Sequence, residues 1–101
     1  MIEELFTDMA SEESKQLAIE MCAIMKEIRQ SYVNIDTGKP ISIRALCSKN
    51  GMDFSIVSRA ENPDELNIPS LLFWLDWTKA LEVELGEIIR EGKKRLDSSY
   101  Q

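Results

Sequence analysis

Residues 42–62, SIRALCSKNGMDFSIVSRAEN, decide the fold of this 101-residue chain. Ser42 and Asp53 are both good N-cap residues, and each precedes a short run in which apolar residues recur at helical spacing. Gly51 separates the two runs, and glycine readily adopts the left-handed conformation that ends a helix in a tight turn. The segment therefore predicts two short helices joined at Gly51.

Four apolar residues of this segment should form a small core between the two helices: Leu46, Cys47, Met52 and Val57. The small side chain of Cys47 allows the helices to approach closely. Two short helices joined in this way are typical of a helix-turn-helix, in which the first helix braces across the DNA backbone and the second lies in the major groove.

A longer helix is predicted before this segment. Ser11 suits its N-cap, and Glu12 and Glu13 follow in the first turn, where a helix favours negative charge. We expect about 20 residues of helix, ending near Asn34 because turn-forming residues occupy positions 36–40. One face of this helix carries the apolar residues Ala18, Met21, Cys22, Met25, Ile28 and Tyr32.

Another helix is predicted after the segment, starting at Pro69-Ser70. One face of it carries Leu71, Trp74, Thr78, Leu81 and Leu85, and its end at residues 93–95 is basic, as a helix C-terminus favours. No stretch alternates with the period of a strand over a useful length, so we expect an all-α protein.

The pattern divides the chain into three parts. Residues 1–23 form an acidic N-terminal helical extension, residues 24–92 a helix-turn-helix domain, and residues 93–101 a basic helix end with a frayed tail. The first ten residues are expected to form a short amphipathic turn, and fraying is expected from Asp97 onward.

The composition excludes several classes of function. No apolar run approaches the roughly 20 residues that cross a bilayer, and Glu3 and Glu4 stand where a secretory signal needs basic residues, so we expect a cytoplasmic protein. The absence of histidine excludes His-based triads and most zinc sites. Cys22 and Cys47 fall in apolar helical patterns and are interpreted as buried hydrophobic residues. We expect no enzyme activity, no metal and no cofactor.

The net charge of −6 is unevenly distributed. Residues 1–23 sum to −5, residues 24–62 to +2 and residues 63–101 to −3. Screening over about 8–10 Å lets a local basic patch act against an acidic total, although the acidic flanks weaken non-specific affinity for DNA. The middle third is therefore the candidate surface for a polyanion.

Several short motifs occur in order over about residues 24–90: SIRALC at 42–47, GMD at 51–53, VSRAE at 57–61, IPSL at 68–71, KALEV at 79–83 and LGEII at 85–89. Together they resemble the Cro/C1-type (XRE, lambda-repressor-like) helix-turn-helix family of phage repressors and bacterial regulators. The resemblance implies a lambda-repressor-like bundle of about five helices, here with an extended N-terminal helix. It also implies a sequence-specific DNA-binding transcriptional regulator, a repressor of phage, mobile-element or antitoxin type.

The resemblance places the recognition helix at residues 53–61, with four residues facing base edges: Phe54, Ser55, Ser58 and Arg59. Arg59 is the strongest candidate because a guanidinium can hold both acceptors of guanine. Lys39, Arg44 and Lys49 are the candidate phosphate contacts. The alternatives are structural: Phe54 as a core residue, Arg59 paired with a carboxylate, and the other three as solvated charges. Glu61 is expected in a structural salt bridge or cap.

Three departures from the family pattern stand out. Ile43 occupies the place of a glutamine that often touches a phosphate, and the loop at 33–41 is about four residues longer than usual. Glu82 replaces the glycine that usually ends a helix, which leaves open whether the fourth and fifth helices merge.

Residues 71–77 are apolar nearly all round. Trp74 lies on the apolar face and is expected in the core, although a stacking surface for single-stranded nucleic acid is the alternative. Leu72 and Phe73 turn away from that face, so the N-terminal extension or a second subunit must cover them; we favour a homodimer that reads a palindromic operator. The alternative function is a protein-interaction module that keeps the fold, with the acidic N-terminal helix as a candidate surface for a protein partner.

Overall fold

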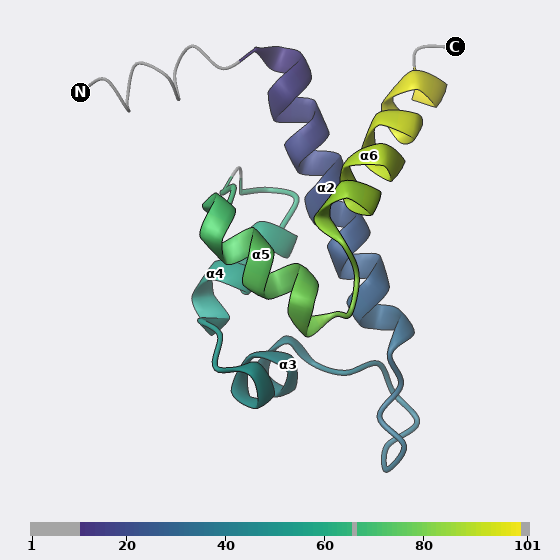
Figure 1. The fold of residues 1–101 in the computed structure, drawn as a ribbon. Coiled ribbons are helices and arrows are strands. Elements are labelled where there is room, and N and C mark those ends of the chain that lie inside the picture. The colour runs from purple at the N-terminus through teal and green to yellow at the C-terminus, as the bar shows by residue number, and fades with distance from the viewer. Residues whose placement is uncertain (1–10, 66, 100–101) are drawn as a thin grey trace, which may run out of the picture.

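The computed structural model describes residues 11–65 and 67–99, and these residues form five helices with no strand beyond a single bridge between Val33 and Pro40. The helices are α2 (Glu12–Ser31), α3 (Ile43–Asn50), α4 (Phe54–Glu61), α5 (Leu71–Ala80) and α6 (Leu85–Ser99), as Figure 1 shows. The all-α class predicted from the sequence is confirmed for this part of the chain. The amphipathic turn expected over residues 1–10 lies outside it.

The helix starts predicted from the sequence are confirmed by their caps. Each cap side chain accepts a hydrogen bond from a backbone N–H one turn ahead, which satisfies a donor that the helix leaves unpaired. The cap oxygens lie 3.1 Å from Ser14 N for Ser11, 3.0 Å from Ala45 N for Ser42, 2.8 Å from Ser55 N for Asp53 and 3.3 Å from Phe73 N for Ser70.

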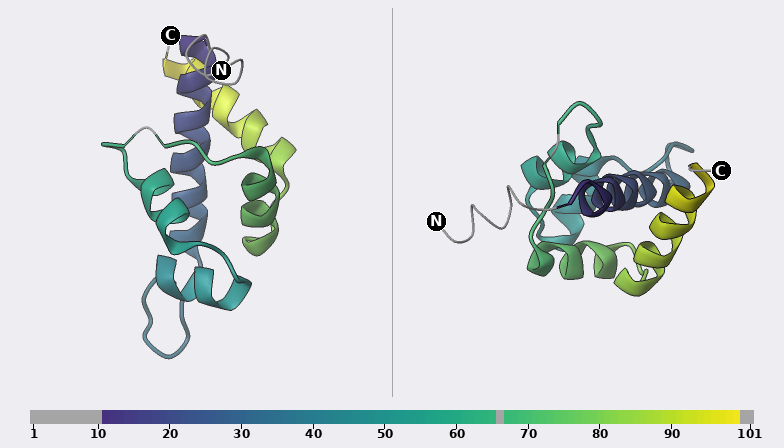
Figure 2. Two further views of the ribbon diagram at one scale, coloured as in Figure 1. Left: turned by 90° about the vertical axis from the view of Figure 1, so that its left-hand side faces the viewer. Right: turned by 90° about the horizontal axis from the view of Figure 1, so that it is seen from above.

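Helices α2 and α6 pack against each other and run in opposite directions, with α2 in the middle of the molecule (Figures 1 and 2). Gly92 permits the close approach, because a Cβ at this position would lie only 2.9 Å from Leu17 Cδ1 and 3.3 Å from Met21 Cγ. Arg95 of α6 donates two hydrogen bonds to Glu27 of α2, at 2.6 and 2.9 Å.

One boundary differs from the sequence interpretation. Helix α6 continues past Asp97, where fraying was expected, to Ser99. Helix α2 is also continuous across residues 23 and 24, where the acidic extension was expected to meet the domain.

The core lies between α2 and the other four helices, with Ile88 as the buried core residue of α6. The largest fully buried side chains are those of Met25, Val57, Trp77 and Leu81. Trp74 and Trp77 lie with ring centroids 4.8 Å apart and are 5% and 0% exposed, so neither ring is available for stacking on a base. Trp74 is thus a core residue, as expected.

Both cysteines are free and buried, as the sequence predicted. Burial, with a smaller effect of the Glu61 carboxylate, raises the pKa of Cys22 to about 12, and burial also raises the pKa of Cys47. Both thiols therefore stay protonated at neutral pH, and a thiol is a poor nucleophile and a poor metal ligand.

Glu82 separates α5 from α6, so the two helices do not merge. It adopts the left-handed conformation with φ of 58°, the region usually taken by glycine after a helix. The N–H of Val83 donates to Thr78 O at 2.9 Å, and the Tyr32 hydroxyl donates to Leu81 O at 2.7 Å. These bonds satisfy carbonyls at the end of α5 and tie that end to the end of α2.

Candidate nucleic-acid interface

Helices α3 and α4 are joined by the tight turn that the sequence predicts. Gly51 has φ of 65°, and the backbone N–H groups of Gly51 and Met52 both donate to Cys47 O. Leu46, Cys47 and Val57 are buried and Met52 is half-buried, so the small core expected between the two helices is present. Helix α3 lies at the end of the molecule opposite the first turn of α2 and the last turn of α6 (Figures 1 and 2).

A buried ion pair fixes α4 against α2. Arg29 donates from Nε to Glu61 Oε2 at 2.7 Å and from Nη2 to Oε1 at 2.8 Å. The third guanidinium nitrogen donates to the backbone oxygen of Ile41, which leads into α3. Glu61 therefore has the structural role expected of it, and Arg29 is a partner that the sequence analysis did not identify.

The outer side of α4 carries the residues predicted to face base edges. Ser55 and Arg59 are exposed, Ser58 is half-buried, and the Phe54 side chain is 38% exposed. The Arg59 side chain makes no hydrogen bond or ion pair with any residue in 11–65 or 67–99. The pair of Arg59 with Glu61 is not formed, because Arg29 occupies that carboxylate; the alternative of Arg59 as a solvated helix residue stays open.

The candidate phosphate contacts lie in three different places. The Arg44 guanidinium carbon sits 4.7 Å from the centroid of the Phe54 ring, so Arg44 faces α4. Lys49 instead lines a groove of about 220 Å³ together with Lys79 and Glu82, and so lies on the side toward the end of α5. Lys39 is exposed in the loop between α2 and α3.

The charge of this surface is more positive than the sequence sum suggests. Residues 39–62 hold four cations (Lys39, Arg44, Lys49, Arg59) and two anions (Asp53, Glu61), a net of +2. Glu61 is buried and neutralised by Arg29 from α2, so it presents no charge outward. Asp53 Oδ1 accepts from Ser55 N and lies 3.4 Å from Ile56 N, so this carboxylate is held at the helix start.

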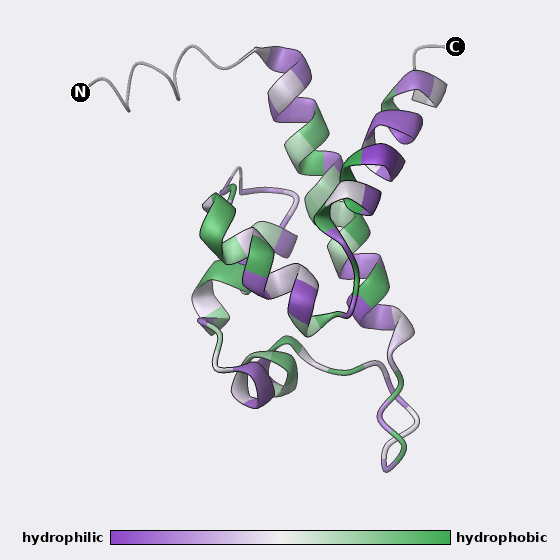
Figure 3. Ribbon diagram, viewed as in Figure 1, coloured by the Kyte–Doolittle hydropathy of each residue, from purple (hydrophilic) through white to green (hydrophobic). Residues whose placement is uncertain are grey.

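Helix α5 carries exposed apolar residues, and much of its ribbon is coloured as hydrophobic in Figure 3. The side chains of Leu71, Leu72 and Leu75 are 65%, 76% and 49% exposed. Phe73, expected beside Leu72 at a subunit contact, is half-buried and packs on Trp77 with ring centroids 6.0 Å apart. The exposed apolar face therefore consists of Leu71, Leu72 and Leu75.

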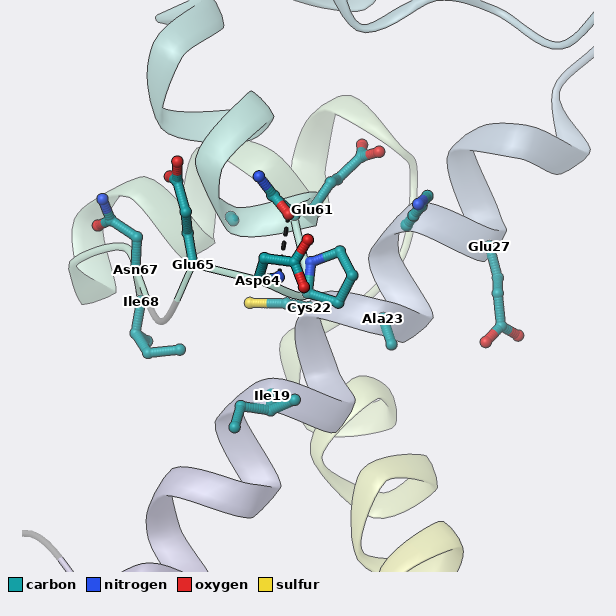
Figure 4. Close-up of a pocket in the computed structure, with 13 residues that line it drawn as sticks. Ile19, Cys22, Ala23, Glu27, Glu61, Asp64, Glu65, Asn67 and Ile68 are labelled. Atoms are coloured by element: carbon teal, nitrogen blue, oxygen red, sulfur yellow. Dashed lines mark hydrogen bonds between the residues drawn. The ribbon is translucent and has the colours of Figure 1, made fainter.

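A groove of about 380 Å³ lies between α2 and the loop that follows α4 (Figure 4). Ile19, Cys22 and Ala23 of α2 form one wall, and Asp64 and Ile68 belong to the other. The loop is shaped by a hydrogen bond from the Asp64 N–H to the Asn62 side-chain oxygen at 3.0 Å. The one thiol in the groove, that of Cys22, is held protonated, so the groove offers apolar surface rather than a nucleophile.

Neither a metal site nor a membrane span emerges from the described residues. No three His, Cys, Asp or Glu side chains in this part of the chain come together as a set of metal ligands. None of its helices combines the length and apolar character that crossing a bilayer needs. Comparison of the chain with protein families, curated proteins and solved structures found no match.

Proposed function

We propose that this protein is a sequence-specific DNA-binding regulator of the lambda-repressor-like kind, which inserts α4 into the major groove and acts by occupying an operator in the cytoplasm. The observation that carries the proposal is Arg59: it is exposed on α4 and has no partner among the described residues. The only other charged residue of that helix, Glu61, is buried against Arg29. An arginine on an exposed short helix after a tight turn is suited to guanine in the major groove.

The roles of the neighbouring side chains follow from their positions. Ser55, one turn before Arg59, can donate to or accept from a base edge, since both residues are exposed on α4. Arg44 and Lys49 on α3, and Lys39 in the preceding loop, are exposed cations that suit phosphate contacts on either side of the groove. The phosphate contacts supply affinity for DNA, and the base contacts supply preference for one DNA sequence.

Two features support the lambda-repressor-like architecture within this proposal. The short helices α3 and α4 follow a longer helix and precede a helix that starts at Pro69-Ser70, in the order that the resemblance implies. Glu82 has a left-handed backbone at the position where the family usually has a helix-ending glycine. The backbone therefore keeps the conformation of that glycine although the residue has changed.

A homodimer completes the proposal, because two copies related by a two-fold axis fit half-sites about 34–36 Å apart. Leu72, with its exposed neighbours Leu71 and Leu75, is the surface proposed for this contact. Phe73 is not part of this exposed surface, since it is half-buried and its ring packs on Trp77.

The test is selection of bound duplexes from a random double-stranded pool at moderate salt, with the mass of the protein in solution measured in parallel. We expect enrichment of an inverted repeat and the mass of a dimer. Affinity should fall steeply as salt rises, with a slope that reports the number of phosphates engaged. A pool without enrichment and an affinity independent of salt would contradict the proposal.

The second candidate function is a protein-interaction module that keeps the fold but binds DNA weakly. The exposed apolar face of Leu71, Leu72 and Leu75 favours it, together with the net charge of −6. Replacing Leu72 by Asp separates the two functions. If α5 serves only dimerisation of a DNA reader, the variant becomes monomeric and loses affinity for paired half-sites but still binds one half-site weakly.

A further inference from the structure

Arg44 and Phe54 form a contact that links the first turns of the two short helices. The guanidinium carbon of Arg44 in α3 lies 4.7 Å from the ring centroid of Phe54 in α4, within the range of about 6 Å in which a cation is attracted to the face of an aromatic ring. Both residues are exposed, and the Phe54 ring is therefore accessible without being a core residue.

The contact leaves the hydrogen-bonding capacity of Arg44 free. A guanidinium has five N–H donors, and no hydrogen bond within residues 11–65 and 67–99 uses those of the Arg44 side chain. The Arg44 side chain makes no ion pair with a carboxylate in the described part of the chain. The nearest acidic residue in sequence to Phe54, Asp53, is engaged by the backbone N–H of Ser55.

The contact with the Phe54 ring restricts the Arg44 side chain, and this restriction favours binding of a phosphate. A free arginine loses rotamer entropy when its side chain is fixed on a ligand. A ring that already holds the guanidinium reduces that loss, and a guanidinium with its donors free matches the oxygens of a phosphate diester. A ring used in this way is covered by the arginine, which conflicts with a direct contact to a thymine methyl.

We infer that Phe54 is a positioning residue, which holds the Arg44 guanidinium at the junction of α3 and α4 as a clamp for a phosphate of the duplex backbone. This inference rests on the proposed DNA binding and revises the base-reading role predicted for Phe54. The pair acts on affinity and not on sequence preference, because the phosphate is the same beside every base pair.

The experiment compares Phe54→Leu, Arg44→Ala and the double variant in the full chain. The probes are two double-stranded DNAs of about 30 base pairs, roughly three helical turns, one of mixed sequence and one carrying the selected operator. We expect Phe54→Leu to weaken binding to both duplexes equally, by about two- to fivefold, the range of an exposed cation–π contact. The double variant should bind like Arg44→Ala alone, and Phe54→Tyr, which keeps a ring, should bind like the native protein.

A second measurement checks the contact without DNA. The side-chain protons of Arg44 over the ring should resonate upfield of their usual NMR positions, and Phe54→Leu should return them. Native protein that binds neither duplex overturns the proposed function and this role with it. Native protein that binds, with Phe54→Leu equal to it or changed only on the operator, overturns the positioning role alone. Unshifted Arg44 protons also overturn it.

Discussion

Arg29 and Glu61 form a buried ion pair through two parallel hydrogen bonds, from Nε at 2.7 Å and from Nη2 at 2.8 Å. The residues lie 32 positions apart in the sequence and join the last turns of α2 and α4. Because the third nitrogen of Arg29 reaches Ile41 O, one guanidinium fixes both the proposed recognition helix and the entry to α3.

Glu61→Gln should destabilise the protein strongly. The variant leaves the Arg29 charge buried without a counter-charge, at a cost of about 3–5 kcal/mol. Urea denaturation followed by circular dichroism measures the loss. The matched control is Glu27→Gln, which breaks the pair with Arg95 at a site where the Glu27 side chain is 56% exposed, and it should cost less than about 1 kcal/mol. Similar losses in both variants would show that burial does not set the strength of the pair.

Arg59→Ala and Lys49→Ala should have different effects on DNA binding. Arg59 faces the bases in the proposed complex, so its loss should remove about 1–3 kcal/mol of discrimination at one position of each half-site. Lys49 contacts a phosphate in the proposed complex, so its loss should weaken binding to all DNA sequences alike. It should also reduce, by about 1, the slope of the logarithm of the binding constant against the logarithm of the salt concentration. Titrations of operator and mutated duplexes at several salt concentrations measure both quantities. Unchanged preference in Arg59→Ala would remove its assignment as a base contact.

Glu82→Gly should stabilise the fold. A left-handed backbone is unfavourable for a residue with a Cβ, and glycine removes that strain, for a gain of up to about 1 kcal/mol. A chain of this size then melts about 4–8 °C higher for each kcal/mol. Glu87→Gly is the control, since Glu87 lies within α6 and glycine should cost about 1 kcal/mol there. A lower melting temperature for Glu82→Gly would contradict the assigned strain.

The buried thiol of Cys22 predicts a loss of stability at alkaline pH. Its pKa in the folded protein is about 12, above the value of about 8.5 in an unfolded chain. The contribution of the Cys22 thiol to the free energy of unfolding is therefore fully present below about pH 8.5. It falls as the pH rises toward 12, because in this range the thiol ionises only in the unfolded state. The slope from this group approaches about 1.4 kcal/mol per pH unit. Denaturation of the native protein and Cys22→Ala between about pH 8 and 11 should show a shallower decline in the variant. Parallel curves would contradict the prediction.

The features predicted correctly from the sequence are those that short segments determine. A cap serine or aspartate bonds to an amide two or three residues ahead, so Ser11, Ser42 and Asp53 could each be identified from their neighbours. The start of α5 was predicted at Pro69-Ser70 without a cap residue, and the structure has Ser70 as the cap. Gly51 was identifiable for the same reason, since a left-handed residue between two apolar runs favours glycine.

The features that the sequence left open depend on contacts between distant segments. No glycine marks the break between α5 and α6 at Glu82 in the sequence. The hydrogen bond from the Tyr32 hydroxyl to Leu81 O, which ties the end of α5 to the end of α2, joins residues 49 positions apart. The close approach of α6 to α2 at Gly92, beside Leu17, is another such contact, which spacing along the chain does not reveal.

The candidate site shows the same division. The outward position of Ser55 and Arg59 was implied by the family resemblance, and both residues are exposed. The pairing of Arg29 with Glu61 and the seating of Arg44 on Phe54 required the crossing of two helices, which no one-dimensional pattern contains.

The opposite courses of α2 and α6 place the first turn of α2 and the last turn of α6 at the end of the molecule opposite α3, with the two turns apart from each other (Figures 1 and 2). Both of these turns therefore lie remote from the turn between α3 and α4. Attaching the protein to a surface through a side chain of the first turn of α2 leaves the turn between α3 and α4 directed into free solution, which is the orientation that a surface-based binding measurement needs.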